Sequence, residues 1–313
     1  MPDPDRPALR ADYDRMRSRG VPGIAVERLA FSVMHANGNV ILVVDEALSG
    51  LSERDAGSEL ARALCASFPA LRVDGVAFVR TRAAQVRMTY FDRAGHQASM
   101  CGDALRCVTR YGAERGYLRT AGADCVLTDD GPKWVSADDG RNRVSLGHGR
   151  EFRRVAADQY FVFTGTPHLV VLLGDRRDLE AIDVKIAGAA FRNDSRLCRE
   201  LDHPEGLHVD FMKRHEHGIQ IRTYEAGAED ETRASGAGSA ASAYIANRIW
   251  GLPYPLRVVV RDGEIQVEGT GHGLLISGVT GHLFGNSAPP EAAPGRKAGF
   301  PRRRAAVSTR VPS

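Results

Sequence analysis

The chain has 313 residues, of which 43% are hydrophobic, with a formal net charge of +3 and five cysteines. This length is sufficient for one large domain or for two domains of ordinary size. The odd number of cysteines and the lack of any CxxC spacing argue against a disulfide framework and a compact zinc module, and they indicate a reducing compartment.

The two ends of the chain differ in composition from its body. Residues 1–27 predict a polar N-terminal extension without the apolar run of a secretory signal. Residues 287–313 contain six basic residues and a single acidic one, Glu291, which predicts a disordered basic tail. The longest apolar runs, VILVV and LVVLL, are too short to cross a bilayer. We therefore expect a cytoplasmic protein that binds neither nucleic acid nor a membrane.

In chain order, the body predicts many short strands and a few helices. FSVMHANGNVILVVDE (31–46) is typical of two strands joined by a loop, and a helix is expected over 51–68. VRMTYF (86–91) and IQIRTY (219–224) alternate as strands do, and VVVRDGEIQVEG (258–269) predicts a hairpin around Asp262 and Gly263. This pattern indicates an α+β fold and differs from the regular βαβ alternation of nucleotide-binding folds.

Two further segments, SMCGDALRC and RASGAGSAASA, each predict the start of a helix. In each, a small residue, Cys101 or Ser235, is followed by a glycine and then by apolar residues at helical spacing. Free backbone N–H groups at a helix start bind anions and lower the pKa of a thiol. We expect the two helix starts to face each other across one small anionic ligand, with the small residues letting the backbone approach it.

The two halves of the chain have a similar layout. A loop with Asn39 precedes an apolar strand and then Cys101, and a loop with Pro167 and His168 precedes an apolar strand and then Ser235. This repetition suggests a duplication. We expect two pseudo-symmetric domains, 28–150 and 151–286, each contributing one helix start to a cleft between them.

Several motifs in this order resemble those of the diaminopimelate epimerase family. FSVMHANGNVILVVDE is similar to its opening MHGLGNDFVVVD pattern, FDRAGHQASMCGDALRC to its FNADG and MCGNGARC segments, and TPH to its NPH. RTYEAGAEDETRASGAGSAAS is similar to its signature around the second catalytic cysteine. The resemblance implies two domains, each a mixed or antiparallel sheet wrapped around a central helix. It also implies an isomerase that inverts the α-carbon of a free amino acid without pyridoxal phosphate or another cofactor.

The family uses two cysteines, one to remove the α-proton and one to supply a proton on the opposite face. Cys101 matches the first, but Ser235 stands in the position of the second, and a hydroxyl is a poor base unless another group activates it. Three interpretations stay open. A neighbour such as Glu231, His168 or His208 assists Ser235; Cys101 is the only base, as in a lyase or dehydratase; or the serine is an engineered change that traps a complex. A catalytically silent amino-acid-binding homologue is a further alternative.

The resemblance also assigns residues to the substrate site, and several depart from the family pattern. Asp92, Asp103, Thr166 and His208 stand where the family has asparagine, and Ala226 replaces an arginine that helps to hold the distal end of the substrate. Losing that arginine and gaining a carboxylate favours a basic or neutral amino acid over diaminopimelate. The full set expected to bind substrate is Asn39, Asp92, Gly102, Asp103, Thr166, His208, Glu225, Gly236 and Ala237.

No metal site is expected. The histidines at 203, 208, 215 and 217 are clustered, but their spacing matches no compact ligand set. The expected partner is the amino-acid substrate, and the family resemblance implies a possible homodimer.

Overall fold

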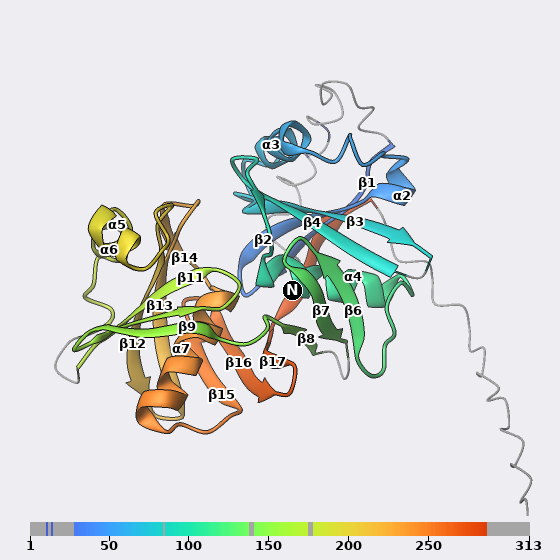
Figure 1. Cartoon of the computed structure of the whole chain (residues 1–313). Coiled ribbons are helices and arrows are strands. Elements are labelled where there is room, and N and C mark those ends of the chain that lie inside the picture. The colour runs from blue at the N-terminus through green and yellow to red at the C-terminus, as the bar shows by residue number, and fades with distance from the viewer. Residues whose placement is uncertain are drawn as a thin grey trace, which may run out of the picture.

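The structure, a computed structural model, describes residues 11 and 14 and the ranges 28–83, 85–137, 141–174 and 178–286. Most of the expected N-terminal extension and all of the expected basic tail lie outside the described residues. Figure 1 shows two lobes, one formed by the blue and green elements of the first half and one by the yellow and orange elements of the second half. No helix in the described ranges is long and apolar enough to span a membrane.

The first lobe contains a mixed sheet and three helices. Its elements are β1 (Ala30–Ala36), β2 (Asn39–Asp45), α2 (Glu46–Ser49), α3 (Ser58–Ser67), β3 (Gly75–Arg82), β4 (Gln85–Asp92), β5 (Gln97–Ala98), α4 (Gly102–Glu114), β6 (Asp124–Thr128), β7 (Gly131–Ser136) and β8 (Asn142–Ser145). The strand pairs β1–β2, β3–β4 and β6–β7 are antiparallel, whereas β2–β3 and β4–β6 are parallel.

The second lobe repeats this order of elements. It contains β9 (Arg150–Ala156), β10 (Gln159–Phe163), β11 (Pro167–Leu172), α5 (Val184–Arg192), α6 (Ser195–Glu200), β12 (His208–His215), β13 (Gly218–Glu225), β14 (Asp230–Thr232), α7 (Gly236–Trp250), β15 (Leu256–Val260), β16 (Gly263–Thr270) and β17 (Gly273–Gly278). The pairs β11–β12 and β13–β15 are parallel, like β2–β3 and β4–β6 in the first lobe. In chain order, α7 stands between β14 and β15, just as α4 stands between β5 and β6. The expected pseudo-symmetric α+β architecture is confirmed.

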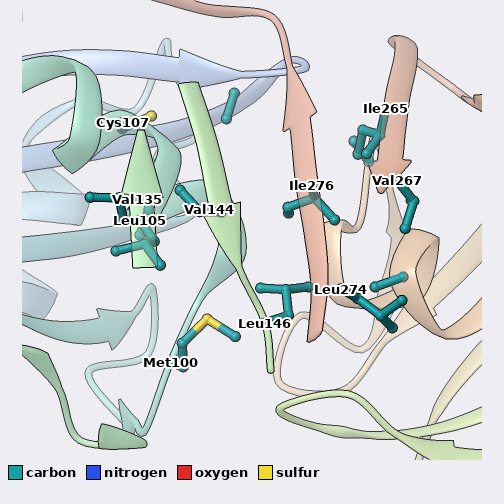
Figure 2. Close-up of a cluster of buried hydrophobic side chains, with 14 of the residues drawn as sticks. Met100, Leu105, Cys107, Val135, Val144, Leu146, Ile265, Val267, Leu274 and Ile276 are labelled. Atoms are coloured by element: carbon teal, nitrogen blue, oxygen red, sulfur yellow. The ribbon is translucent and has the colours of Figure 1, made fainter. Parts of the chain in front are cut away.

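Two strand pairings join the lobes. β8 of the first lobe pairs antiparallel with β17 of the second. The last strand, β18 (Thr280–Gly285), returns to the first lobe and pairs with β1. Hydrophobic side chains on β8 and β17, among them Val144 and Ile276, belong to one buried cluster that extends into both lobes (Figure 2). The expected division into two domains at residue 150 stays a prediction. The final strand, β18, belongs to the sheet of the first lobe, although it lies in the second half of the chain.

Each lobe wraps its strands around one helix, and the period-two pattern of the strands explains the layers. On β2, Ile41 and Val43 face the inner core that contains α4, whereas Leu42 and Val44 face the outer cluster beneath α3. On the second lobe, strands β11 and β12 likewise place alternate residues inward and against α5 and α6. Strands buried on both faces read as continuous apolar runs, which is the pattern of VILVV and LVVLL.

The helix expected over 51–68 is too long at its start. The structure begins α3 at Ser58, with Gly57 as the N-cap residue. The reason is local, because Asp55 accepts hydrogen bonds from the backbone N–H and the hydroxyl of Ser52 and holds that segment in a turn. Helices α5 and α6 were not expected, although Asp183 and Asp194 cap their first turns.

Gly278 lies where the lobes meet, and it offers a test of this junction. A Cβ added there would lie 2.4 Å from Asn37 Oδ1 and 2.5 Å from Arg106 Nη1, two buried groups that cannot move freely. We expect Gly278→Ala to lower the free energy of unfolding by about 1–3 kcal/mol, measured by urea denaturation. Gly271→Ala is the matched control, because a Cβ there meets nothing within 4 Å. Equal stability of the two variants would contradict this account of the junction.

Candidate active site

Helices α4 and α7 begin against each other. A Cβ added to Gly102 would lie 3.7 Å from the Cα of Gly236, and the reverse distance is also 3.7 Å. An added Cβ at Gly236 would approach Ile276 to 2.6 Å. A methyl group at either glycine would therefore be in ordinary van der Waals contact with the facing helix start, so the two backbones lie close together. The clash with Ile276 is the reason why position 236 favours glycine.

Cys101 is the N-cap residue of α4 and is partly buried against the inner core. Burial and then the charge of Asp103 raise the pKa of the thiol to about 12, and the backbone N–H groups of Asp103 and Ala104 act in the opposite direction. The helix start lowers this pKa as expected, but burial outweighs the effect of its N–H groups. A thiolate at this position therefore needs further stabilisation by a positive charge.

Ser235 is buried and caps α7. Its hydroxyl oxygen accepts a hydrogen bond from the Gly238 N–H at 3.0 Å, and its carbonyl accepts one from the Ser239 hydroxyl at 2.7 Å. The first N–H groups of a helix have no partner within the helix, so those of Gly236 and Ala237 are suited to bind a carboxylate. The carbonyl of Ala237 accepts a hydrogen bond from the Thr164 hydroxyl, which ties the loop before β11 to this helix start.

Asn39 connects the two helix starts. Its amide nitrogen donates to Asp103 Oδ2 and to the carbonyl of Ala234, both at 2.6 Å, and its oxygen accepts from the Thr232 hydroxyl at 3.2 Å. The side chain is buried, and both of its N–H hydrogens are used within the protein. The structure thus places Asn39, expected to bind substrate, as a link between the residues next to Cys101 and Ser235.

Asp103 forms a buried ion pair that the sequence analysis missed. Arg106, one turn further along α4, is fully buried and donates to Asp103 Oδ1 at 2.6 Å and to Asn37 Oδ1 at 2.7 Å. The Asn37 amide donates in turn to the carbonyls of Asp262 and Glu264 in the second lobe. An arginine three residues after an aspartate on a helix is the sequence signal that could have revealed this pair.

A second buried set lies behind Thr166. His168 Nδ1 lies 2.8 Å from Asp210 Oδ2, and His168 Nε2 lies 2.9 Å from the Thr166 hydroxyl. His168 and Asp210 are completely buried, and Thr223 donates to Asp210 at 2.6 Å. An added Cβ at Gly238 would meet Asp210 Oδ1 at 2.3 Å, so this carboxylate lies against the first turn of α7. An aspartate inside the apolar strand LHVDFM was a signal for this set.

His208 is stacked on His168, with ring centroids 4.8 Å apart. Burial and the charge of His168 lower the pKa of His208 well below its usual value, so it is neutral near pH 7. Its Nδ1 accepts a hydrogen bond from the Ala226 N–H at 3.3 Å. The Nδ1 atom of His208 is therefore occupied by the backbone, and Nε2 carries the proton of the neutral ring.

Acidic groups gather around the same space. Burial and then the charge of Asp103 raise the pKa of Glu225 to about 8, against the opposing effect of a hydrogen bond with Thr232. Asp92 lies across from the loop that follows β13, because a Cβ added at Gly227 would be 3.5 Å from its Oδ2. Its other oxygen accepts the His96 N–H at 2.8 Å. This side of the site therefore carries carboxyl groups from both lobes.

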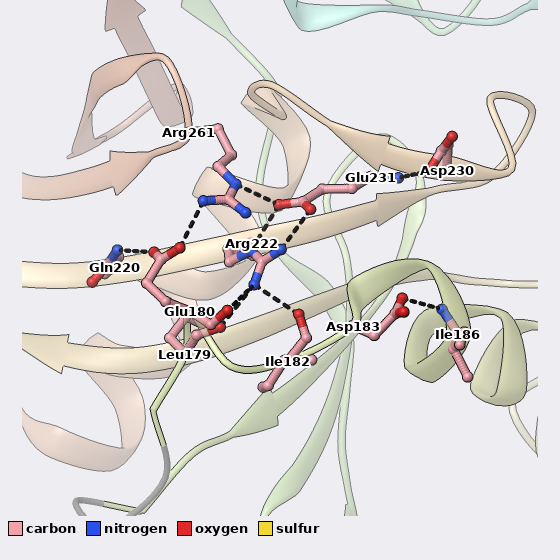
Figure 3. A network of polar contacts seen from close by, with 10 residues as sticks. All are labelled: Leu179, Glu180, Ile182, Asp183, Ile186, Gln220, Arg222, Asp230, Glu231 and Arg261. Atoms are coloured by element: carbon pink, nitrogen blue, oxygen red, sulfur yellow. Dashed lines mark hydrogen bonds and ion pairs between the residues drawn. The ribbon is translucent and has the colours of Figure 1, made fainter.

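Glu231, expected as one possible helper of Ser235, belongs to a different network (Figure 3). Arg222 binds both of its oxygens, at 2.7 and 2.6 Å, and Arg261 binds one at 2.9 Å. Arg222 also donates to the carbonyls of Leu179 and Ile182. The network fixes β14, which leads into the loop with Ser235. Burial acts in the opposite direction, but the two arginines outweigh it and lower the pKa of Glu231, so this carboxylate is a weak base. In the described ranges, no group of three or more His, Cys, Asp or Glu side chains could hold a metal ion.

Comparison with known proteins agrees with the motifs. A family model described as diaminopimelate epimerase matches residues 31–148. The diaminopimelate epimerase of Archaeoglobus fulgidus is 31% identical over 82% of this chain and 95% of its own length. That of Methanocella arvoryzae is 30% identical over 77% and 90%.

Solved structures share the fold at low identity. A phenazine biosynthesis protein of the PhzF family from Bacillus anthracis superimposes with a TM-score of 0.61 at 15% identity, covering 82% of this chain and 98% of its own. A hydroxyproline epimerase from Agrobacterium vitis does so with a TM-score of 0.56 at 13% identity, covering 83% and 93%. These likenesses show the two-lobed architecture.

Glu225 predicts a pH dependence of stability. Its pKa of about 8 in the folded protein lies above its ordinary value of 4.5, so the folded state binds this proton more tightly than the unfolded state does. The stabilisation is complete below pH 4.5 and is lost as the pH rises to about 8. We expect Glu225→Gln to reduce the loss of unfolding free energy over this interval, measured by urea denaturation at several pH values. Glu216→Gln, at a side chain that is 81% exposed, is the control, and identical pH profiles for both variants would refute the assignment.

Proposed function

The chain belongs to the diaminopimelate epimerase family, and we propose that it is an isomerase that inverts the α-carbon of a free amino acid without a cofactor. The observation that supports this most directly is the pair of helix starts in contact at Gly102 and Gly236. Their backbone N–H groups converge where the carboxylate of one small ligand can bind. The α-carbon of that ligand would then lie between Cys101 and Ser235.

In this mechanism the substrate carboxylate is bound by N–H groups of both helix starts. These donors stabilise the negative charge that develops when the α-proton leaves. The ammonium group of the substrate and the amides of α4 favour the thiolate of Cys101, which takes the α-proton. A proton from the Ser235 hydroxyl then reaches the opposite face of the carbon. The Gly238 N–H and the start of α7 stabilise the resulting alkoxide until it takes a proton from solvent. The Cys101 thiol gives its proton to solvent, so the thiolate is restored and no net proton is gained or lost.

The chemical difference between Cys101 and Ser235 supports elimination as the alternative reaction. Ser235 caps α7 with its hydroxyl oxygen, which is also the ordinary structural role of serine at a helix start. If Ser235 transfers no proton, Cys101 remains the single base, and loss of a leaving group from the β-carbon replaces inversion. The product distinguishes the two reactions, because elimination yields a keto or dehydro acid and inversion yields the other enantiomer.

We also propose that the substrate side chain is basic. Asp92 and Glu225 contribute carboxyl groups from the two lobes, and Ala226 stands where the family has an arginine. His208 is neutral, so it adds no positive charge there. A side chain that ends in an ammonium or guanidinium group complements the two carboxyl groups, whereas the distal carboxylate of diaminopimelate does not.

Substitution of the two central residues tests the reaction. We expect Cys101→Ala to abolish exchange of the substrate α-proton with deuterated solvent, because no base remains. Ser235→Cys should raise the rate of inversion about 100-fold, since it supplies a second thiol. Proton NMR in D2O and polarimetry measure the two rates over a panel of L- and D-amino acids. Cys125→Ala is the control at another half-buried thiol. The absence of exchange with every amino acid, even for Ser235→Cys, would overturn the proposal.

Substitution of Asp92 tests the substrate class. We expect Asp92→Asn to raise KM for lysine, ornithine or arginine about tenfold with little change in kcat, because a charge-assisted hydrogen bond is lost away from the reacting carbon. Asp202→Asn, at a side chain that is 76% exposed, should leave both constants unchanged. A preference of the unaltered enzyme for diaminopimelate over these amino acids would contradict the assignment.

A further inference from the structure

The loop before β11 touches both helix starts and carries Thr166. The Thr164 hydroxyl donates to the carbonyl of Ala237 in the first turn of α7. A Cβ added at Gly165 would lie 2.8 Å from the Cε of Met100, the residue before the N-cap of α4. Thr166 follows directly and is partly exposed, whereas Thr164 is buried. Thr166 is therefore a partly exposed hydroxyl residue beside the proposed substrate site.

The hydrogen bonds behind Thr166 fix the direction in which its hydroxyl donates. Both oxygens of Asp210 face donors, because Thr223 donates to Oδ1 at 2.6 Å and His168 Nδ1 lies 2.8 Å from Oδ2. A carboxylate can only accept, so Nδ1 carries a hydrogen. In the neutral ring Nε2 then carries none, and it accepts from the Thr166 hydroxyl at 2.9 Å. The single hydrogen of this hydroxyl is used inside the protein, so only its lone pairs can bind a ligand.

A series of contacts links Thr166 to the acidic side of the site. The ring of His208 stacks on that of His168 with centroids 4.8 Å apart, which fixes the plane of the His168 ring. His208 Nδ1 accepts from the N–H of Ala226, the residue after Glu225. Thr166 is thus connected to the region of the Glu225 carboxyl group, where the cationic end of the substrate is proposed to bind.

We propose that Thr166 is a specificity-determining residue whose hydroxyl accepts a hydrogen bond from the side-chain ammonium of a basic amino acid, and that His168 and Asp210 are positioning residues that hold it as an acceptor. An asparagine at this position, as in the family, has N–H groups that can donate to a distal carboxylate, whereas the Thr166 hydroxyl in this arrangement cannot. The choice of ligand rests on the proposed function, whereas the hydrogen-bond arrangement does not.

The arrangement is tested on the unaltered protein. The ¹⁵N chemical shifts of an imidazole distinguish a protonated from an unprotonated nitrogen. In the assigned NMR spectrum near pH 7, we expect His168 to carry its hydrogen on Nδ1 and none on Nε2. A hydrogen on Nε2 would overturn the proposal, because the Thr166 hydroxyl would then be free to donate to a carboxylate.

The ligand preference is tested by calorimetric titration with L-lysine and with L-norleucine, which has the same carbon chain without the ammonium group. We expect Thr166→Val to raise Kd for lysine about tenfold and to leave Kd for norleucine unchanged, because only lysine loses an acceptor. Thr166→Ser keeps the hydroxyl and should retain the preference. Thr128→Val is the matched control, since that buried hydroxyl donates to the Gly131 carbonyl at 2.8 Å. Equal losses for both ligands would indicate a structural role and overturn the proposal.

A double-mutant cycle tests the part played by Asp210. If Asp210 acts through Thr166, Asp210→Asn should weaken lysine binding in the unaltered protein but add no further loss to Thr166→Val. Additive losses would remove Asp210 from this role. Lysine binding that depends on Thr166, together with no α-proton exchange, would support the specificity role and reject the proposed isomerase. Exchange of the α-proton without any dependence on Thr166 would reject the specificity role alone, so the two failures are distinguishable.

Discussion

The arrangement of the site depends on the side-chain amide of Asn39. It binds Asp103, two residues after Cys101, and the carbonyl of Ala234, one residue before Ser235. One planar group thereby holds the starts of two helices that are more than a hundred residues apart in the chain. Because both contacts are buried and 2.6 Å long, separating the lobes would leave polar groups without partners. Asn37, two residues earlier, makes a second link between the lobes. Its side chain accepts a hydrogen bond from Arg106 on α4 and donates one to the carbonyl of Asp262 in the β15–β16 hairpin.

Burial has the same consequence for two acidic groups of the site. It keeps the Cys101 thiol protonated, with a pKa of about 12. It also keeps Glu225 largely protonated near neutral pH, since its pKa is about 8. A ligand that brings an ammonium group next to the sulfur changes this balance, so binding and formation of the base are coupled. At Ser235 the hydroxyl oxygen caps α7, and the same Gly238 N–H would stabilise an alkoxide there.

Much of the fold followed from short-range patterns. The apolar alternation of β4 and β13 and the spacing after Cys101 and Ser235 predicted their elements correctly, because these patterns reflect one buried face. The start of α3 was placed too early, since a turn between Ser52 and Asp55 replaces the first helical turns. The ion pair of Asp103 with Arg106 and the set around Asp210 were missed. Their local signals, an arginine three residues after an aspartate and an aspartate inside an apolar strand, do not tell which partner is buried with each charge.

By itself, the sequence determined the family, the α+β class and the two small-residue helix starts, because motif order and hydrophobic period are properties of the chain alone. Only the tertiary structure decided what surrounds those residues. It brought Gly102 to Gly236, enclosed Cys101 among carboxyl groups, and used Asn39 as a link between the lobes. The physical reason is that pKa values and hydrogen-bond partners depend on burial and on groups distant in the chain, which meet only when the two lobes pack together.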